Sequence, residues 1–213
     1  MEDKDFGLYI HIPFCVRKCL YCDFCSFAGR LGEADPYVSA LLKEAEIMAP
    51  LYRDRTVTSL FIGGGTPSLL TGEQMKRLMS GLKENFNFAR DPEMSLEANP
   101  GTVTGDKLEA FRETGLNRIS LGVQAVQDRL LKRLGRIHSF READEAVRLA
   151  RAAGFERISV DLMTGLPGQK KGDLEESLGW AIGHGVGHVS LYSLIVEEGT
   201  PFYAPAEQNT GFC

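Results

Sequence analysis

The sequence has no excess of basic residues, no long apolar run and few cysteines outside one short segment. Its 24 Lys and Arg residues are outnumbered by 29 Asp and Glu residues, giving a formal net charge of −5. Nucleic acids and anionic membranes favour a basic face, so we expect neither as a partner. Residues 1–6 are polar and acidic, and no apolar run approaches the roughly 20 residues that span a bilayer. We therefore expect a cytoplasmic protein without a membrane span.

Disorder is also excluded as the main state of the chain. Hydrophobic residues make up 43% and charged residues 25% of the 213 residues, enough to bury one sizeable core. Six short stretches with β-branched or alternating apolar character predict strands. These stretches are residues 7–12, 57–62, 94–98, 118–123, 157–162 and 188–194.

Helical segments with recognisable start signals lie between these strands. Asp35 before Pro36 predicts a helix that is capped by Asp35 and begins at the proline. Two further segments carry capping boxes, formed by Thr71 with Gln74 and by Ser139 with Glu142. Strand and helix thus alternate six times along the chain, which predicts a parallel sheet with outer helices.

Unusual polar or glycine-rich segments follow the predicted strands in turn. They are the cysteine-rich segment, residues 63–67, residues 97–101, Gln124, Asp161 with residues 165–168, and residues 197–201. Nearly every strand therefore contributes to one rim, as in a β/α barrel, whereas an open sheet binds ligands at one switch point. With six strands we expect an incomplete (β/α)6 barrel of the TIM type.

The cysteines are the most specific chemical signal. Cys15, Cys19 and Cys22 are spaced C-x-x-x-C-x-x-C on the segment after the first strand. Three thiolates can hold three irons of a [4Fe–4S] cluster and leave the fourth iron open to another ligand. The alternative is a zinc site completed by Cys25 or His11, but zinc motifs more often pair two separate C-x-x-C knuckles, and no separate second knuckle follows residues 15–25. The spacing favours the cluster.

Together with the cysteines, several longer stretches resemble the radical S-adenosylmethionine (SAM) superfamily. Within it, the chain is similar to the branch that contains oxygen-independent coproporphyrinogen III oxidase (dehydrogenase) and the HemW-type haem chaperone. The matching stretches run from Tyr9 to Phe202 and read YIHIPFC, YCDF, GGGTPS, EANPG, NRISLGVQ, LGRIH, SVDLMTGLPGQ and HVSLYSLIVEEGTPF.

The resemblance implies a fold, two cofactors and a set of site residues. The fold would be the partial barrel of radical SAM proteins, with Cys15, Cys19 and Cys22 binding a [4Fe–4S] cluster. SAM would chelate the open iron, and its reductive cleavage would yield a 5′-deoxyadenosyl radical. The implied SAM contacts are Gly64, Gly65 and Thr66 at the amino-acid part, the polar residues Glu97, Gln124, Arg136 and Asp161, and Tyr9, Tyr21 and Ile195 near the cluster or adenosine.

Two departures from the family pattern bear on function. The dehydrogenase resembles C-x-x-x-C-x-x-C-x-C, but this chain has Phe24 at the fourth-cysteine position and Cys25 one residue later. The resemblance therefore favours a haem chaperone that delivers haem to acceptor proteins; the alternative is the dehydrogenase, which decarboxylates propionates of coproporphyrinogen III. Haem or porphyrinogen, haem-acceptor proteins and an electron donor are the implied partners. None of the four histidines is assigned as a haem ligand.

The second departure is length. Family members continue past the sixth strand into a C-terminal domain. We therefore expect a partial-barrel domain over residues 1–203 and a truncated tail over residues 204–213, where that domain would begin. The chain would then be a fragment or a shortened gene product.

Overall fold

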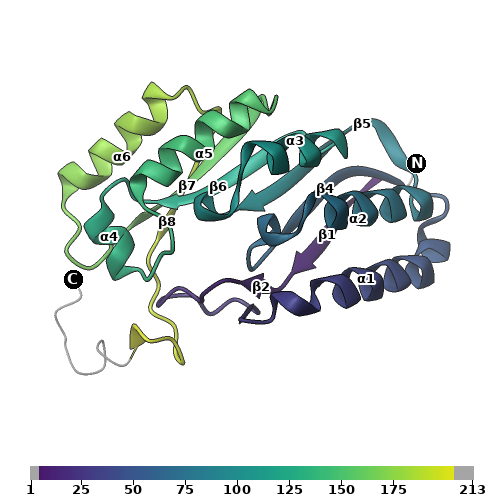
Figure 1. Cartoon of the computed structure of the whole chain (residues 1–213), viewed down its shortest axis with the longest axis horizontal. Helices are drawn as coiled ribbons and strands as arrows, with labels where there is room; N and C mark the ends of the chain where they lie inside the picture. Colours follow the sequence, from purple (N-terminus) through teal and green to yellow (C-terminus); the bar gives the residue numbers. More distant parts are fainter. Residues whose placement is uncertain (1–4, 204–213) are drawn as a thin grey trace.

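The computed structural model describes residues 5–203, and the expected tail, residues 204–213, lies outside them. One parallel sheet of six strands forms the centre, in the order β1-β4-β5-β6-β7-β8 (Figure 1). All six predicted strands are confirmed, although β5 begins earlier than expected. The strands are β1 Asp5–Ile12, β4 Thr56–Gly64, β5 Phe88–Ala98, β6 Arg118–Gln124, β7 Arg157–Thr164 and β8 His188–Ser193.

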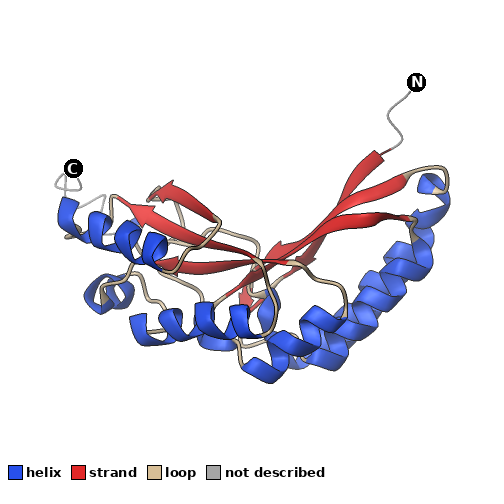
Figure 2. Cartoon of the chain, turned by 90° about the horizontal axis from the view of Figure 1, so that it is seen from above, coloured by secondary structure: helices blue, strands red, loops and turns tan. Residues whose placement is uncertain are grey.

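Helices cover one side of this sheet. Figure 2 shows the sheet curved like half a barrel with the helices along its convex side. The helices are α1 Ala34–Met48, α2 Gly72–Asn85, α3 Gly105–Glu113, α4 Asp128–Arg133, α5 Phe140–Ala152 and α6 Lys171–Gly183. The predicted fold class, an incomplete barrel of parallel strands with outer helices, is therefore confirmed. No helix within residues 5–203 is long and apolar enough to cross a bilayer.

Short elements complete the chain. A small parallel pair after β1 brings two stretches of the cysteine-rich segment together. The short strands and 3-10 helices are β2 Phe14–Cys15, β3 Phe27–Ala28, η1 Leu31–Glu33, η2 Ala49–Tyr52, η3 Pro67–Leu69 and η4 Pro100–Thr102.

The helix starts were predicted correctly in two of three cases. Both capping boxes are present, with the Thr71 and Ser139 side chains each accepting from the backbone three residues on. The prediction that Asp35 caps α1 is wrong. The helix begins at Ala34 because η1 runs directly into it, so no residue adopts the extended cap conformation. Asp35 instead lies in the first turn and accepts from Gln74 Nε2 of α2 at 3.1 Å.

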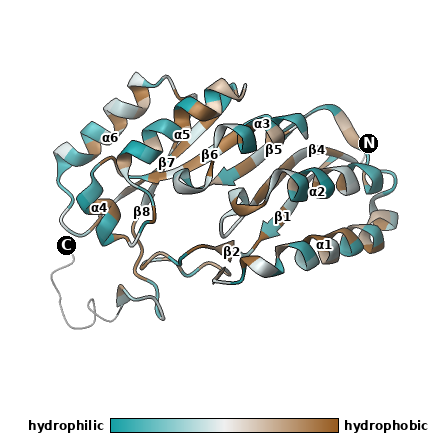
Figure 3. Cartoon of the chain, in the orientation of Figure 1, coloured by the Kyte–Doolittle hydropathy of each residue, from teal (hydrophilic) through white to brown (hydrophobic). Residues whose placement is uncertain are grey.

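Alternate residues of the strands form the core between sheet and helices. Leu96, Leu121 and Val160 on β5, β6 and β7 are each 0% exposed. In Figure 3 the outward sides of α2 and α4 are mostly hydrophilic, as expected for helices that bury one stripe. Burial of this apolar face stabilises the fold and fixes the carboxyl ends of the strands along one rim.

The other face of the sheet is concave and polar. It carries the residues between the core positions: Tyr9, His11, Ser59, Glu93, Ser95, Glu97, Arg118, Ser120, Ser159, Asp161, His188, Ser190 and Tyr192. A closed eight-stranded barrel fills its interior with bulky branched side chains. Here the described strands β1 and β8 are the two edges of the sheet, so the polar inner face lies in an open trough.

Candidate functional site

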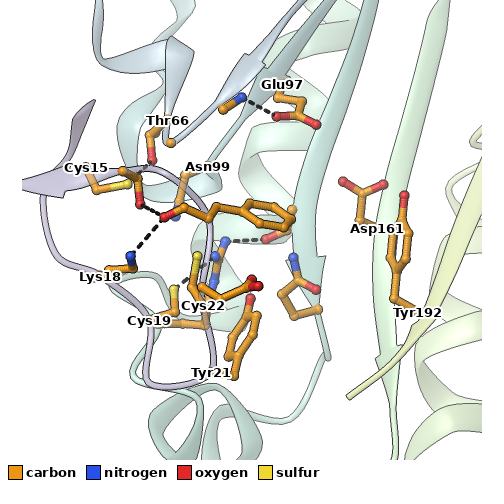
Figure 4. A pocket seen from close by; sticks show the side chains of 18 of the residues that line it. Cys15, Lys18, Cys19, Tyr21, Cys22, Thr66, Glu97, Asn99, Asp161 and Tyr192 are labelled. Carbon is orange, nitrogen blue, oxygen red and sulfur yellow. Dashed lines mark hydrogen bonds between the residues drawn. The ribbon is translucent and has the colours of Figure 1, made fainter. Parts of the chain in front are cut away.

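A cavity of about 480 Å³ lies at the carboxyl ends of the strands, between the sheet and the cysteine loop, which we define as residues 15–25. Every residue predicted for the site lines it except Tyr9. The predicted residues in its wall are Cys15, Cys19, Tyr21, Cys22, Gly64, Gly65, Thr66, Glu97, Gln124, Arg136, Asp161 and Ile195. Figure 4 shows Cys19, Tyr21 and Cys22 on one side of the cavity, with Asp161 and Tyr192 on the other.

The cysteine loop is fixed against the segment that follows α4. Leu20 N donates to Leu134 O at 3.0 Å. Arg17 Nη2 donates to Gly135 O and to Arg136 O, each at 2.9 Å. These backbone-directed bonds hold an irregular loop in one position beside the cavity, which a binding site on a loop requires.

The three predicted ligand cysteines are free thiols with differing exposure. Cys15 is buried, whereas Cys19 and Cys22 are half-buried. Thr66 Oγ1 donates to Cys15 Sγ at 3.6 Å, and Arg136 Nη1 donates to Cys19 Sγ at 3.4 Å. Donors at sulfur stabilise thiolates and are a recurrent feature around iron–sulfur clusters.

The four donors that a structural zinc ion would need are not gathered at one point in residues 5–203. Among the described residues, no three His, Cys, Asp or Glu side chains are grouped to share one ion. Zinc needs four such donors at about 2.0–2.3 Å, whereas the thiolates of a cluster each bind a different iron. His11 is already engaged, since its ring nitrogens bond Tyr9 Oη at 2.9 Å and Cys25 O at 2.8 Å. The Cys25 side chain is exposed and does not line the cavity.

Two glycines allow the chain after β4 to press against the cysteine loop. Gly64 has φ of +117°, and a β-carbon there would lie 2.7 Å from His11 Cε1. A β-carbon at Gly65 would lie 2.7 Å from Phe14 O and 3.0 Å from Cys15 Sγ. Glycine is therefore required by the protein's own packing, in addition to any approach of a ligand.

Two carboxylates face the cavity from the inner face of the sheet. Glu97 accepts from Gly64 N at 3.1 Å, and Asp161 accepts from Ser120 Oγ at 3.1 Å and from Ser190. Burial is the main cause that raises the pKa of both side chains. Carboxylates accept hydrogen bonds from hydroxyl and ammonium groups, which the ribose and methionyl parts of SAM carry.

The end of β6 is strained at the site. Gln124 has φ of +70° and is the only non-glycine residue with positive φ in the described chain. A register shift between Gly122 and Gln124 accompanies it. Strain of this kind persists only where the surroundings fix it, and it clusters at functional sites.

Arg136 spans the gap between this strand and the cysteine loop. Its Nη2 donates to Gly122 O at 2.6 Å, but its Nε is buried with no partner in residues 5–203. A buried donor without an acceptor is costly, by about 1–3 kcal/mol. Arg136 thus joins the end of β6 to Cys19 of the cysteine loop and leaves one donor unsatisfied.

Several cavity residues were not predicted, among them Lys18, Asn99, Ser120, Met163 and Tyr192. Three of these residues, Ser120, Met163 and Tyr192, could have been found from the alternation of side chains along their strands. Ser120 alternates with the buried core residues Ile119 and Leu121 on β6, and Met163 lies two residues after Asp161 on the same face of β7. Tyr192 pairs with Met163 on β8.

Asn99 is held in place by a buried histidine. The His138 ring nitrogens lie 3.2 Å from Asn99 Oδ1 and 3.2 Å from Val123 O. Burial lowers the pKa of His138 to about 4, so the ring is neutral near pH 7. Tyr9, by contrast, lies outside the cavity wall, is 55% exposed and stacks on Phe61.

The comparison with protein families identifies the class. Residues 9–181 match the family model described as the radical SAM superfamily. The chain belongs to this superfamily, whose members use a [4Fe–4S] cluster and SAM.

Individual relatives are more specific. The chain is 46% identical over 201 residues to "Heme chaperone HemW" of Escherichia coli K12, covering 92% of this chain and 52% of the relative. It is 42% identical over 196 residues to the protein of the same name from Bacillus subtilis, again covering 92% and 52%. The chain thus spans about half the length of the curated relatives it matches.

The solved structures agree with the fold. The structure described as "Coproporphyrinogen III oxidase (HemN) from Escherichia coli is a Radical SAM enzyme" superposes with a TM-score of 0.87 at 32% identity, covering 96% of this chain and 47% of that chain. An archaeal Elp3 from Methanocaldococcus infernus superposes with a TM-score of 0.65 at 19% identity, covering 97% and 49%, and shows the fold alone.

Proposed function

We propose that this chain is the cluster- and SAM-binding part of a haem chaperone of the HemW type, which delivers haem to acceptor proteins. The observation that carries the proposal is the cavity itself. Three cysteines on a fixed loop face the polar residues Glu97 and Asp161 across one space. The names of the relatives add haem as the cargo.

Different residues of the cavity would bind the cluster and SAM. Cys15, Cys19 and Cys22 would hold the cluster. When bound, the cluster supplies single electrons and an iron with an open coordination position. Arg136, whose positive charge lines the cavity, would take the carboxylate of the methionyl part of SAM, beside backbone groups of Gly65.

The remaining walls would hold the rest of SAM. Glu97 and Asp161 would accept hydrogen bonds from hydroxyl or ammonium groups, and Gln124 would add an amide at the strained end of β6. Tyr21 and Ile195 would provide apolar surface for the adenine. Gly64 and Thr66 would line the amino-acid end, while Tyr9 would act indirectly through its bond to His11.

The alternative function is oxygen-independent oxidative decarboxylation of coproporphyrinogen III. The similarity to the HemN structure favours it, since the two chains share the barrel and its rim. Phe24 argues against it, because the extra cysteine of the dehydrogenase pattern would stand at this position. The Phe24 side chain is 65% exposed and lines the cavity instead.

Two assays on the anaerobically reconstituted chain test the proposal. We expect the chain to bind haem with a new Soret band and to pass it to apomyoglobin in a stopped-flow mixing experiment. With SAM, dithionite and coproporphyrinogen III we expect no protoporphyrinogen. Clear turnover would support the dehydrogenase, and absence of both haem binding and turnover would contradict both functions for this chain.

A further inference from the structure

The inner face of the sheet carries a cation directly beneath the cavity. Arg118 lies two residues before Ser120 on β6, so both side chains face the trough, and Ser120 lines the cavity. Its register neighbours are Ser95 on β5 and Arg157 on β7. Arg118 therefore occupies the middle of the trough, one inward position deeper than the cavity wall.

The Arg118 guanidinium is held in a fixed orientation across three strands. Nη1 donates to Ser95 Oγ at 3.2 Å, and Nη2 donates to Ser159 Oγ at 2.7 Å. Both serines are almost completely buried, with 2% and 1% exposure. Arg118 itself is only half-buried, in contrast to its two serine partners.

The charge of Arg118 is not matched by an ion pair within residues 5–203. Its inward neighbour Arg157 differs, because Arg157 Nη1 lies 3.9 Å from Glu93 Oε2. Asp161 is close enough to interact electrostatically with Arg118, but its hydrogen bonds are with Ser120 and Ser190. A half-buried guanidinium whose hydrogen bonds within residues 5–203 go only to two neutral hydroxyls favours binding of an anion.

We propose that Arg118, together with Ser95 and Ser159, receives a carboxylate of the ligand that enters the trough. Arginine presents a planar fork that matches a carboxylate bidentately, and the two serines set that fork in advance. This inference rests on the proposed function, under which the ligand is a tetrapyrrole and the carboxylate is one of its propionates. The propionate would enter the trough beneath the cavity.

Comparing the affinities of haem and haem dimethyl ester isolates the proposed contact between Arg118 and a propionate. The ester keeps the macrocycle and iron but has no propionate charge. We would titrate both, in the same dilute detergent, into the reconstituted wild-type chain and into Arg118→Gln, following the Soret band. Arg157→Gln is the matched control, since it removes an inward cation that already has a partner. Circular dichroism would check that each variant is folded.

We expect haem to bind wild type about tenfold or more tightly than it binds Arg118→Gln, as for loss of a charged hydrogen bond. The ester should bind both proteins equally and at the weaker level, and Arg157→Gln should resemble wild type. Equal binding of haem by wild type and Arg118→Gln would overturn the inference while leaving the proposed function intact. Failure of wild type to bind either haem or ester would instead count against the proposed function.

A folding defect in Arg118→Gln would not end the test. Arg118→Lys keeps the positive charge and removes the fork, so it should show an intermediate loss of haem affinity with no change for the ester. The wild-type preference for haem over its ester needs no variant at all. If the ester bound wild type as tightly as haem, no carboxylate contact would exist and the inference would be wrong.

Discussion

The two faces of one sheet show how this chain separates stability from chemistry. On the outer face, Leu96 and Leu121 are 0% exposed under the helices. One residue further along, Glu97 lines the cavity on the inner face, and one residue before Leu121 so does Ser120. Because the side chains of a strand alternate, each strand contributes to the core and to the site at once.

The contrast between the two faces indicates that packing on the outer face positions the inner side chains, whereas the inner side chains themselves contribute little to stability. Truncating a side chain on the outer face should lower the free energy of unfolding of the protein. Truncating one on the inner face should instead weaken ligand binding. Substitutions on opposite faces of the same strand should therefore have separable effects.

The largest expected effect is loss of the cluster in Cys19→Ala. One of three thiolates is removed, and a cluster with an open iron has none to spare, so iron and sulfide content should collapse. Circular dichroism should show the barrel still folded, since Cys19 lies on the loop and outside the core. Cys25→Ala is the matched control and should retain full iron and sulfide. Full cluster content in Cys19→Ala would refute the ligand assignment, and equal loss in both variants would favour a four-thiolate site.

Next in size is the contrast between Leu121→Ala and Ser120→Ala on β6. The leucine is buried in the core, so its truncation should lower the free energy of unfolding by about 2–5 kcal/mol. Ser120→Ala removes one hydrogen bond to Asp161 and should cost only about 1 kcal/mol. Urea unfolding of the two proteins measures both values. Equal costs would contradict the division between the faces.

The buried His138 should make the free energy of unfolding depend on pH. Its pKa is lowered to about 4 in the folded chain and lies near 6.5 when unfolded. Between these values the unfolded chain binds more protons, so the free energy of unfolding should fall by about 3 kcal/mol from pH 7 to pH 4. Glu97 and Asp161, with raised pKa values, act in the opposite sense. The difference between wild type and His138→Gln at each pH isolates the histidine, and a difference that does not change with pH would contradict its neutral burial.

The smallest expected effect is in Glu97→Gln. The amide oxygen can keep the bond from Gly64 N, so the free energy of unfolding should change by less than about 1 kcal/mol. Loss of the charge should weaken SAM binding about tenfold, measured by equilibrium dialysis with labelled SAM. Unchanged SAM affinity would remove Glu97 from the site.

Much of this arrangement could be predicted from the sequence because it depends on local signals. The six strands follow from apolar alternation, and the cysteine spacing and glycine-rich segment are contiguous. The start of α1 could not be predicted, since η1 overrides the Asp35 signal. Nor could the partners of Arg118, because Ser95 and Ser159 meet it only through the register of three strands.

The position of Tyr9 relative to the cavity also could not be predicted from the sequence. The family pattern implies that Tyr9 lies near the cluster or adenosine, and this stays a prediction. Its side chain is on the inner face of the edge strand β1, bonds His11 and does not line the cavity. The position of an inward side chain relative to the rim depends on strand tilt and register, which the order of residues alone does not specify.

Electron paramagnetic resonance tests the central claim most directly. The anaerobically reconstituted chain would be reduced with dithionite and recorded with and without SAM. The account predicts a reduced [4Fe–4S] signal that changes shape when SAM is added, because the cofactor binds the iron left open by Cys15, Cys19 and Cys22. A cluster signal that SAM leaves unchanged, or stoichiometric zinc with no cluster signal, would contradict it.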